Sequence, residues 1–188
     1  MKFNKKIKIM PMKFPEDKDE IGSWQQQFEN NQNFKSIEHF ILEDNIFYSL
    51  GEVIETNYEI IPIGDDERKL AFVAKTEDGK VVAWLLMHIF DLNTTEPQMF
   101  LQYIVIHPEY QKSGIGTQIA NEIFLNTKKY VGVKPTEIFS YIHQDNIASQ
   151  NLFKKFNFSL YPSGDHYLRA LTNCPKFVGD KNQIEPGE

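Results

Sequence analysis

Residues 111–116 read QKSGIG, which places two glycines around one isoleucine, after an apolar run and before a helical pattern. A helix that begins here has backbone N–H groups without intrahelical acceptors, and its dipole favours a negative charge. Gly114 and Gly116 carry no Cβ, so phosphate oxygens can approach the backbone, and Lys112 adds a positive charge nearby. The segment therefore predicts a phosphate cradle, with an ordinary tight turn as the alternative.

Two common phosphate-binding motifs are absent from this segment, which limits the ligands that the cradle could bind. A Walker loop needs the string GxxxxGK[ST], which does not occur in the sequence. A dinucleotide fingerprint needs a third glycine, and Ile119 stands in its place. A protein that binds some other nucleotide is therefore kept only as a rival interpretation.

Apolar spacing and turn residues outline the elements that would hold the cradle. Residues 99–106 form an almost unbroken apolar run, which predicts a central strand covered on both faces. Asp78 and Gly79 lie between two β-rich runs, which is a strong hairpin signal. The other expected elements are a strand at 6–10, two short helices within 20–55, hairpin strands at 69–75 and 80–90, a helix from 115, a strand at 136–142, a helix at 146–156, and strands at 157–161 and 165–171. This order predicts an α/β fold, with a mixed central sheet flanked by helices.

The composition excludes several classes of protein. The 188 residues are 41% hydrophobic, which suits one globular domain. A formal net charge of −6 argues against binding to nucleic acid or to an anionic membrane. Cys174 is the only cysteine, which excludes an internal disulfide and a cysteine-based zinc cluster and favours a cytoplasmic location. No apolar stretch is long enough for a bilayer and the basic N-terminus lacks an apolar core, so we expect no membrane span, no signal peptide and no metal.

Two stretches resemble a known family. The sequence IVIHPEYQKSGIGTQIANEIF resembles the core motif of the GNAT superfamily of N-acetyltransferases, a strand, a proline-containing turn, Gln/Arg-x-x-Gly-x-Gly/Ala and a helix. Gln111, Gly114 and Gly116 match this motif position for position. Residues 146–158 resemble the family's second motif, Asn-x-x-Ser/Ala-x-x-Leu-Tyr-x-x-x-Gly-Phe. Asn157 replaces the glycine of that motif and tolerates the same left-handed backbone.

The resemblance implies a site for acetyl-CoA as co-substrate. The central strand should splay from its neighbour at 104–106 and expose backbone groups that pair with pantetheine. Residues 112–117 should cradle the pyrophosphate, and Asn146 should hydrogen-bond the pantetheine arm. Core packing at 104–106 and simple helix capping by Asn146 are the structural alternatives. The residues expected to contact the cofactor are Ile104, Val105, Ile106, Gln111, Lys112, Ser113, Gly114, Ile115, Gly116, Thr117, Asn146 and Phe153.

The catalytic groups depart from the family pattern. Relatives often use a tyrosine of the second motif as general acid, and that position here is Phe153, which has no proton to give. A thiol with a pKa near 8.5 leaves readily, so an acid helps without being obligatory. The substitute acids are Tyr103, Tyr141 and Tyr161, and the candidate bases are His88, Asp91, Glu96, His107 and His143. From these sets, the residues that we assign to catalysis are Tyr141, Tyr161 and Glu96.

The expected function is transfer of an acetyl group from acetyl-CoA to a primary amine of a small molecule or peptide. We expect one GNAT-like domain over 1–174, with its matched core at about 69–171, and a polar tail over 175–188. Fourteen acidic residues between positions 16 and 67 would attract a cationic amine, unless they form only a solvated surface. The alternative is a catalytically weak GNAT-fold protein that binds acyl-CoA as a regulatory or partner-binding module, which Phe153 supports. A homodimer is left open.

Overall fold

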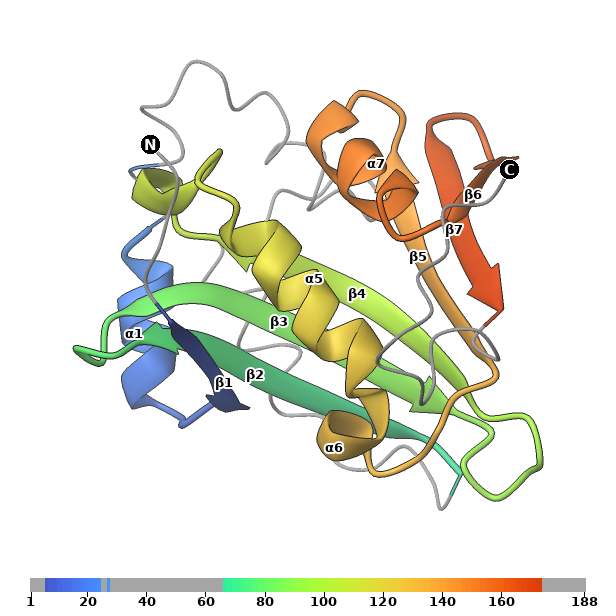
Figure 1. Ribbon diagram of the computed structural model, residues 1–188, viewed down its shortest axis with the longest axis horizontal. Coiled ribbons are helices and arrows are strands. Elements are labelled where there is room, and N and C mark those ends of the chain that lie inside the picture. The colour runs from blue at the N-terminus through green and yellow to red at the C-terminus, as the bar shows by residue number, and fades with distance from the viewer. Residues whose placement is uncertain (1–5, 25–26, 28–65, 174–188) are drawn as a thin grey trace.

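The computed structural model describes residues 6–24, 27 and 66–173. These residues form one seven-stranded sheet in the order β1-β2-β3-β4-β5-β7-β6, and only the β4–β5 pair is parallel (Figure 1). The elements are β1 Ile7–Pro11, α1 Glu16–Gly22, β2 Arg68–Thr76, β3 Val81–Phe90, β4 Gln98–Ile106, a 3-10 turn at Pro108–Tyr110, α5 Ile115–Leu125, α6 Thr127–Val131, β5 Glu137–His143, α7 Ile147–Lys154, β6 Ser159–Ser163 and β7 Tyr167–Asn173. The α/β fold with a mixed sheet and flanking helices, which the sequence predicts, is confirmed.

Two clusters of buried side chains lie on the two faces of the sheet. α5 and α7 cover one face, where Ile115, Ile119 and Ile123 of α5 pack on apolar side chains from the central strands. α1 lies against the other face, where its Ile21 and the following Trp24 pack against Trp84 of β3. The helical spacing read from the sequence therefore marks the buried side of α5.

The β2–β3 hairpin forms as its turn residues predict. Gly79 has a φ of 86°, a left-handed conformation that glycine adopts without strain. The N–H of Gly79 donates to the carbonyl of Thr76 at 2.9 Å, which closes the turn. β3 is the strand that follows, and all of its residues except Phe90 are buried.

The prediction of a doubly covered strand at 99–106 is wrong for its second half. In β4 only Met99 and Leu101 are buried, and residues 102–106 are half-buried. The reason is that β4 pairs with β5 only over its first three residues, so the rest of the strand lacks a neighbour on that side. The strand that is covered almost throughout is β3.

Other boundaries shift by a few residues. β6 runs to Ser163 and includes Pro162, which the sequence placed in the turn, and Gly164 begins the turn with a φ of 71°. β6 is an edge strand, where the missing N–H of proline is tolerated. Asn157 has a φ of 60°, so the left-handed backbone expected at this position is confirmed. The second helix expected before 55, most of the acidic segment and the tail over 175–188 lie outside the described residues, and the domain limits stay predictions.

The side chain of Asp17 links α1 to β2. Its side chain is 3% exposed, and Oδ1 accepts a hydrogen bond from Nζ of Lys75 at 2.6 Å. Oδ2 accepts from the N–H of Lys13 at 2.7 Å, so both carboxylate oxygens are satisfied. Removing a buried carboxylate that accepts two hydrogen bonds is destabilising, because both donors are then left unpaired.

We expect Asp17→Ala to lower the free energy of unfolding by about 3 kcal/mol, because it leaves the Lys75 ammonium without its carboxylate partner in a largely buried position. Urea unfolding measures this change. Asp19→Ala is the matched control, since Asp19 is an exposed carboxylate in the same helix and its loss should cost under about 0.5 kcal/mol. Equal stability of the two variants would show that the Asp17 contacts contribute nothing.

Candidate functional site

β4 and β5 form a fork. They pair only at Gln98↔Glu137, Met99↔Ile138 and Phe100↔Phe139, and beyond this rung they diverge (Figure 1). α5 lies on the β4 side of the opening and α7 on the β5 side. The two helices that carry the sequence motifs therefore border the same opening in the sheet.

A β-bulge lies at the base of the fork. The β3–β4 register passes from Leu86↔Tyr103 to Met87↔Leu101, so Gln102 is an extra residue in β4. Bulges bend a strand and re-aim its groups, and they are frequent beside active sites. The sequence reasoning missed Gln102, because a bulge depends on how two strands are paired and leaves no signal in one apolar run.

The backbone groups of β4 alternate between β3 and the fork. The N–H of His107 donates to the carbonyl of Val82 at 3.0 Å, which makes this a hydrogen-bonded pair of the antiparallel ladder. Because such pairs alternate along the ladder, Val105 also bonds to β3, whereas Ile104 and Ile106 turn their backbone groups toward the fork. Of the three predicted pantetheine contacts in β4, the geometry thus favours Ile104 and Ile106.

The glycine-rich turn stands at the open end of the fork. Lys112 has a φ of 56° and Gly114 a φ of 94°, and Gly114 caps the N-terminus of α5. The first hydrogen bond of α5 runs from the N–H of Gln118 to the carbonyl of Gly114 at 3.1 Å. The N–H groups of residues 115–117 therefore have no intrahelical acceptor, and with the helix dipole they form a site suited to an anion.

Side-chain contacts tie this turn to β4. Nε2 of Gln111 donates to the carbonyl of Ile106 at 3.1 Å, and the Ser113 hydroxyl donates to the carbonyl of Tyr110. A Cβ added at Gly116 would lie 3.9 Å from Leu152 of α7 and 4.0 Å from Ile106, so the start of α5 packs close to both arms of the fork. The turn is thereby fixed relative to the strand it follows.

Asn146 caps α7 on the other arm. It is 8% exposed, and its Oδ1 accepts a hydrogen bond from the N–H of Ser149 at 3.0 Å. The capping role proposed as the structural alternative is therefore present. Its side-chain carbonyl serves the helix, and its amide nitrogen donates to no described residue, so ligand contact by that nitrogen stays a prediction.

Phe153 packs in the core. Its ring is 4% exposed and makes edge contacts with Phe158, at a centroid distance of 4.9 Å. Phe124 of α5 lies 6.3 Å away on the same side of the sheet. At this position an aromatic ring serves to join α7 to α5, and contact with a cofactor stays a prediction.

The two assigned tyrosines lie in one row but at different distances from the fork. Tyr141 of β5 and Tyr161 of β6 both pair with Arg169 of β7, so the three side chains share the face opposite α5. Tyr141 follows the last paired rung of the fork by two residues, and its ring contacts Phe100 edge-on at 5.7 Å. Tyr161 lies two strands away, about 10 Å from β5. Both side chains are about half exposed.

Glu96 is not brought to the fork. It is exposed in the β3–β4 loop, where its N–H donates to the Thr94 hydroxyl at 3.1 Å. Asp91 lies in the same loop. The loop joins the paired ends of the strands, so both carboxylates are remote from the open part of the fork.

His107 and His143 have local structural partners. Nδ1 of His107 accepts the N–H of Glu109 at 3.2 Å, which caps the 3-10 turn after β4. Nδ1 of His143 accepts the N–H of Asp145 at 3.2 Å, at the far end of β5. Burial lowers the pKa of His107, and the Lys80 charge lowers it further against the opposing effect of Glu109.

The lowered pKa of His107 makes stability depend on pH. Below about pH 6.5 the unfolded chain binds a proton at this histidine more readily than the folded chain does. The free energy of unfolding should therefore decrease as the pH is lowered. The slope is at most about 1.4 kcal/mol per pH unit for each such histidine. We expect His107→Gln to flatten the profile between pH 7.5 and 5.5, measured by urea unfolding. An unchanged slope would contradict the assignment.

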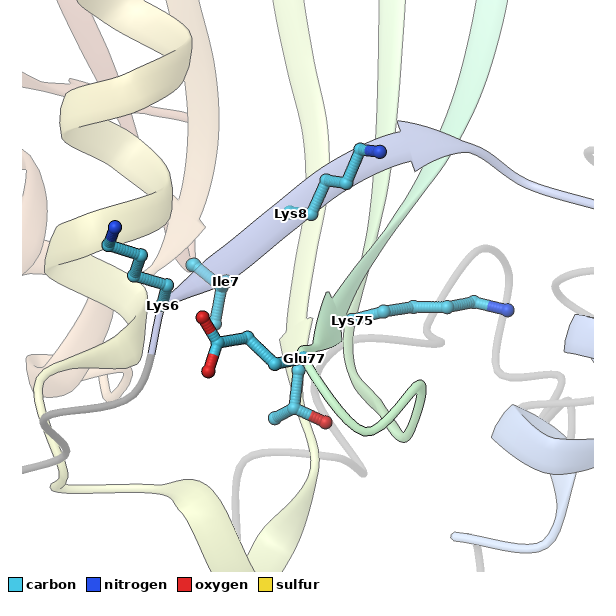
Figure 2. Close-up of a pocket in the computed structure, with 6 residues that line it drawn as sticks. Lys6, Ile7, Lys8, Lys75 and Glu77 are labelled. Atoms are coloured by element: carbon cyan, nitrogen blue, oxygen red, sulfur yellow. The ribbon is translucent and has the colours of Figure 1, made fainter.

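A shallow groove lies elsewhere, at the outer edge of the sheet. Figure 2 shows the residues that line it, which are Lys6, Ile7 and Lys8 at the start of β1 and Lys75, Thr76 and Glu77 at the end of β2. β3 separates these strands from the fork in the sheet order. The groove is therefore no part of the candidate site.

Within the described residues, no three or more His, Cys, Asp or Glu side chains come together in a way that could hold a metal ion. In the same part of the chain, no helix combines the length and the apolar character that a membrane span requires.

The family follows from a sequence comparison that agrees with this geometry. A model of the acetyltransferase (GNAT) family matches residues 24–158, which include the fork, the glycine turn and α7. The chain belongs to the GNAT family of acetyltransferases. The match extends from Trp24 through Phe158, and so covers both motifs found in the sequence. No protein with a curated description matches the sequence significantly.

Solved GNAT-like structures share the fold at low identity. Spermidine N-acetyltransferase from Vibrio cholerae, in complex with CoA and spermine, is 15% identical with a TM-score of 0.61, and the alignment covers 91% of this chain and 97% of that chain. The N-acetyltransferase PseH from Campylobacter jejuni is 14% identical with a TM-score of 0.52, over 89% of this chain and 97% of that chain. A domain from Methanocaldococcus jannaschii is 16% identical with a TM-score of 0.57, over 90% and 99% of the two chains. At identities of 14–16% these similarities show that the fold is shared, and no more.

Proposed function

We propose that this GNAT chain transfers an acetyl group from acetyl-CoA directly to a primary amine of a small molecule or peptide. The observation that carries the proposal is the fork between β4 and β5, which ends at a glycine turn with unpaired helix N–H groups. A strand-like pantetheine arm fits along the free edge of β4, and an anionic pyrophosphate fits the start of α5.

The residues proposed to hold the cofactor divide into two groups. The backbone groups of Ile104 and the N–H of Ile106 would pair with the pantetheine amides, because they face the fork, whereas the carbonyl of Ile106 already accepts a hydrogen bond from Gln111. Residues 112–117 would surround the pyrophosphate, with backbone N–H groups as donors. Acetyl-CoA, when bound, supplies the activated acetyl group. α5 packs over one face of the sheet, and Tyr141 on the opposite face is about half exposed, so we propose that the amine approaches from that opposite face, beside β4 and β5.

Tyr141 is the tyrosine best placed to protonate the departing thiolate. It lies just beyond the last paired rung, on the face from which the amine would approach. Its partial exposure is consistent with a side chain that borders a substrate site. Tyr161 and Glu96 lie farther from the fork, and their catalytic roles have weaker geometric support.

Polyamines are the first acceptors to test, since the Vibrio cholerae enzyme that shares this fold is a spermidine N-acetyltransferase solved with spermine. Amino sugars, lysine-like amines and peptide amines complete the panel. The assay measures thiol release from acetyl-CoA, and calorimetry compares acetyl-CoA with CoA, ATP and NAD. Amine-dependent thiol release supports the proposal. Binding of acetyl-CoA without release for any amine would favour the regulatory binding module, and tighter binding of ATP or NAD would contradict both.

A further inference from the structure

His88 of β3 lies at the rung from which the fork opens. Its neighbours Met87 and Ile89 are buried in the cluster under α5, so the His88 side chain lies on the opposite face, where an amine would approach. One row of cross-strand partners runs over this face, formed by Lys69, His88, Phe100 and Phe139. The row crosses the last pair of β4 and β5, Phe100↔Phe139, and continues into β7. One strand, β4, therefore lies between His88 and the fork, and neighbouring strands are about 4.8 Å apart.

His88 is buried between an aromatic ring and a carboxylate. The residue is 7% exposed, and the ring of Phe90 lies at a centroid distance of 3.8 Å. Its Nε2 lies 3.2 Å from Oε2 of Glu67, yet Nε2 makes no well-aligned hydrogen bond within the described residues. The Glu67 carboxylate is therefore within ion-pair distance of the imidazole, without the alignment of a hydrogen bond.

The protonation state of His88 suits a base. Burial lowers its pKa, the Lys69 charge lowers it further, and the Glu67 carboxylate raises it without reversing the shift. Near pH 7 the imidazole is therefore neutral. The carboxylate beside Nε2 favours the tautomer with hydrogen on Nε2, which leaves the lone pair on Nδ1 to accept a proton.

We propose that His88 is the group that accepts the proton released by the attacking amine, directly or through one water, and that Glu67 orients the imidazole and stabilises its charged form. This assignment rests on the proposed function. The lone pair of the amine forms the C–N bond to the acetyl carbon, and the C–S electron pair leaves with the thiolate. The N–H proton passes to Nδ1 of His88, and the thiolate takes up a proton from a neighbouring donor or from water.

The other candidate bases have weaker positions. Glu96 and Asp91 lie in the loop at the paired end of the strands. His107 uses Nδ1 as a structural acceptor, and His143 does the same at the far end of β5. Among the five candidates named from the sequence, His88 combines a position beside the fork, burial and a carboxylate partner.

The first test replaces His88 with glutamine and measures kcat from pH 5 to 9.5, at saturating acetyl-CoA and the best amine of the panel. We expect kcat at pH 7 to fall about a hundredfold or more, with the affinity for acetyl-CoA unchanged by calorimetry. The acidic limb of the wild-type profile should disappear. His166→Gln is the matched control, because His166 is an exposed histidine in the β6–β7 turn, and it should retain wild-type kcat.

Two further measurements separate a base from a merely structural histidine. Added imidazole should restore part of the kcat of His88→Ala, because the vacated space lies beside the fork. Glu67→Gln removes a charge that raises the His88 pKa and should move the acidic limb to lower pH, whereas Lys69→Met should move it to higher pH. These opposite shifts require that His88 titrates in the profile.

The outcomes distinguish the two proposals. An active wild type together with an unchanged pH profile in His88→Gln would overturn the assignment of His88 and leave the proposed function standing. Loss of activity in His88→Ala without rescue by imidazole, and without opposite shifts in the two charge variants, would also overturn it. A wild type that binds acetyl-CoA and acetylates no amine would overturn both.

Discussion

Gly114→Val is expected to weaken acetyl-CoA binding at least a hundredfold. Gly114 adopts a φ of 94° at the N-terminus of α5, and no atom lies within 4 Å of the place where its Cβ would be. The substitution therefore fills space that the protein leaves open, at the point where an anion would meet the backbone donors. Loss of two charge-assisted hydrogen bonds, at about 1.5–3 kcal/mol each, is enough for this change in affinity. Calorimetry with acetyl-CoA measures it.

Gly79→Val is the matched control for this variant. Gly79 has a φ of 86° and equally open surroundings, but it lies in the β2–β3 turn. Both substitutions should lower the free energy of unfolding by about the same amount, because each places a β-branched residue in a left-handed backbone conformation. Only Gly114→Val should lose affinity for acetyl-CoA. If the two variants bind equally well, the cradle lies elsewhere.

Several features of the fold could be predicted because they depend on neighbouring residues. The left-handed turn at Gly79, the helix after Gly114 and the capping of α7 by Asn146 follow from local backbone and side-chain chemistry. The buried stripe of α5 follows from helical periodicity. These features also form most of the candidate cofactor site, which is why the motifs located it.

The remaining features depend on pairing between distant segments. Gln102 is a bulge only because β3 and β4 slip by one residue beside Leu86, and the half-buried part of β4 exists because β5 leaves it. His88 comes within one strand of the fork through the register of three strands. No single segment carries that information, so the sequence could name His88 as a candidate and could not rank it.

The sequence also could not identify the general acid that protonates the thiolate, or show how Phe153 packs. Motif spacing places Phe153 at the position of a tyrosine acid, but the structure packs its ring between Phe124 and Phe158. A hydroxyl introduced there would be buried, which costs about 1–3 kcal/mol without a partner. The donor for the thiolate is therefore better sought on the face opposite α5, where Tyr141 lies at the fork and Tyr161 lies two strands away.

Tyr141→Phe is accordingly expected to lower kcat about ten- to a hundredfold while leaving the KM for acetyl-CoA within twofold. The loss lies at the lower end of what general acids contribute, because a thiol with a pKa near 8.5 leaves readily without help. Tyr161→Phe is the matched control, since it removes a hydroxyl of similar exposure from the same row of the sheet, about 10 Å farther from β5. Steady-state thiol release measures both variants. Equal rates for wild type and Tyr141→Phe would assign the proton to water, and a loss confined to Tyr161→Phe would place the reacting thioester nearer to β6 than the fork allows.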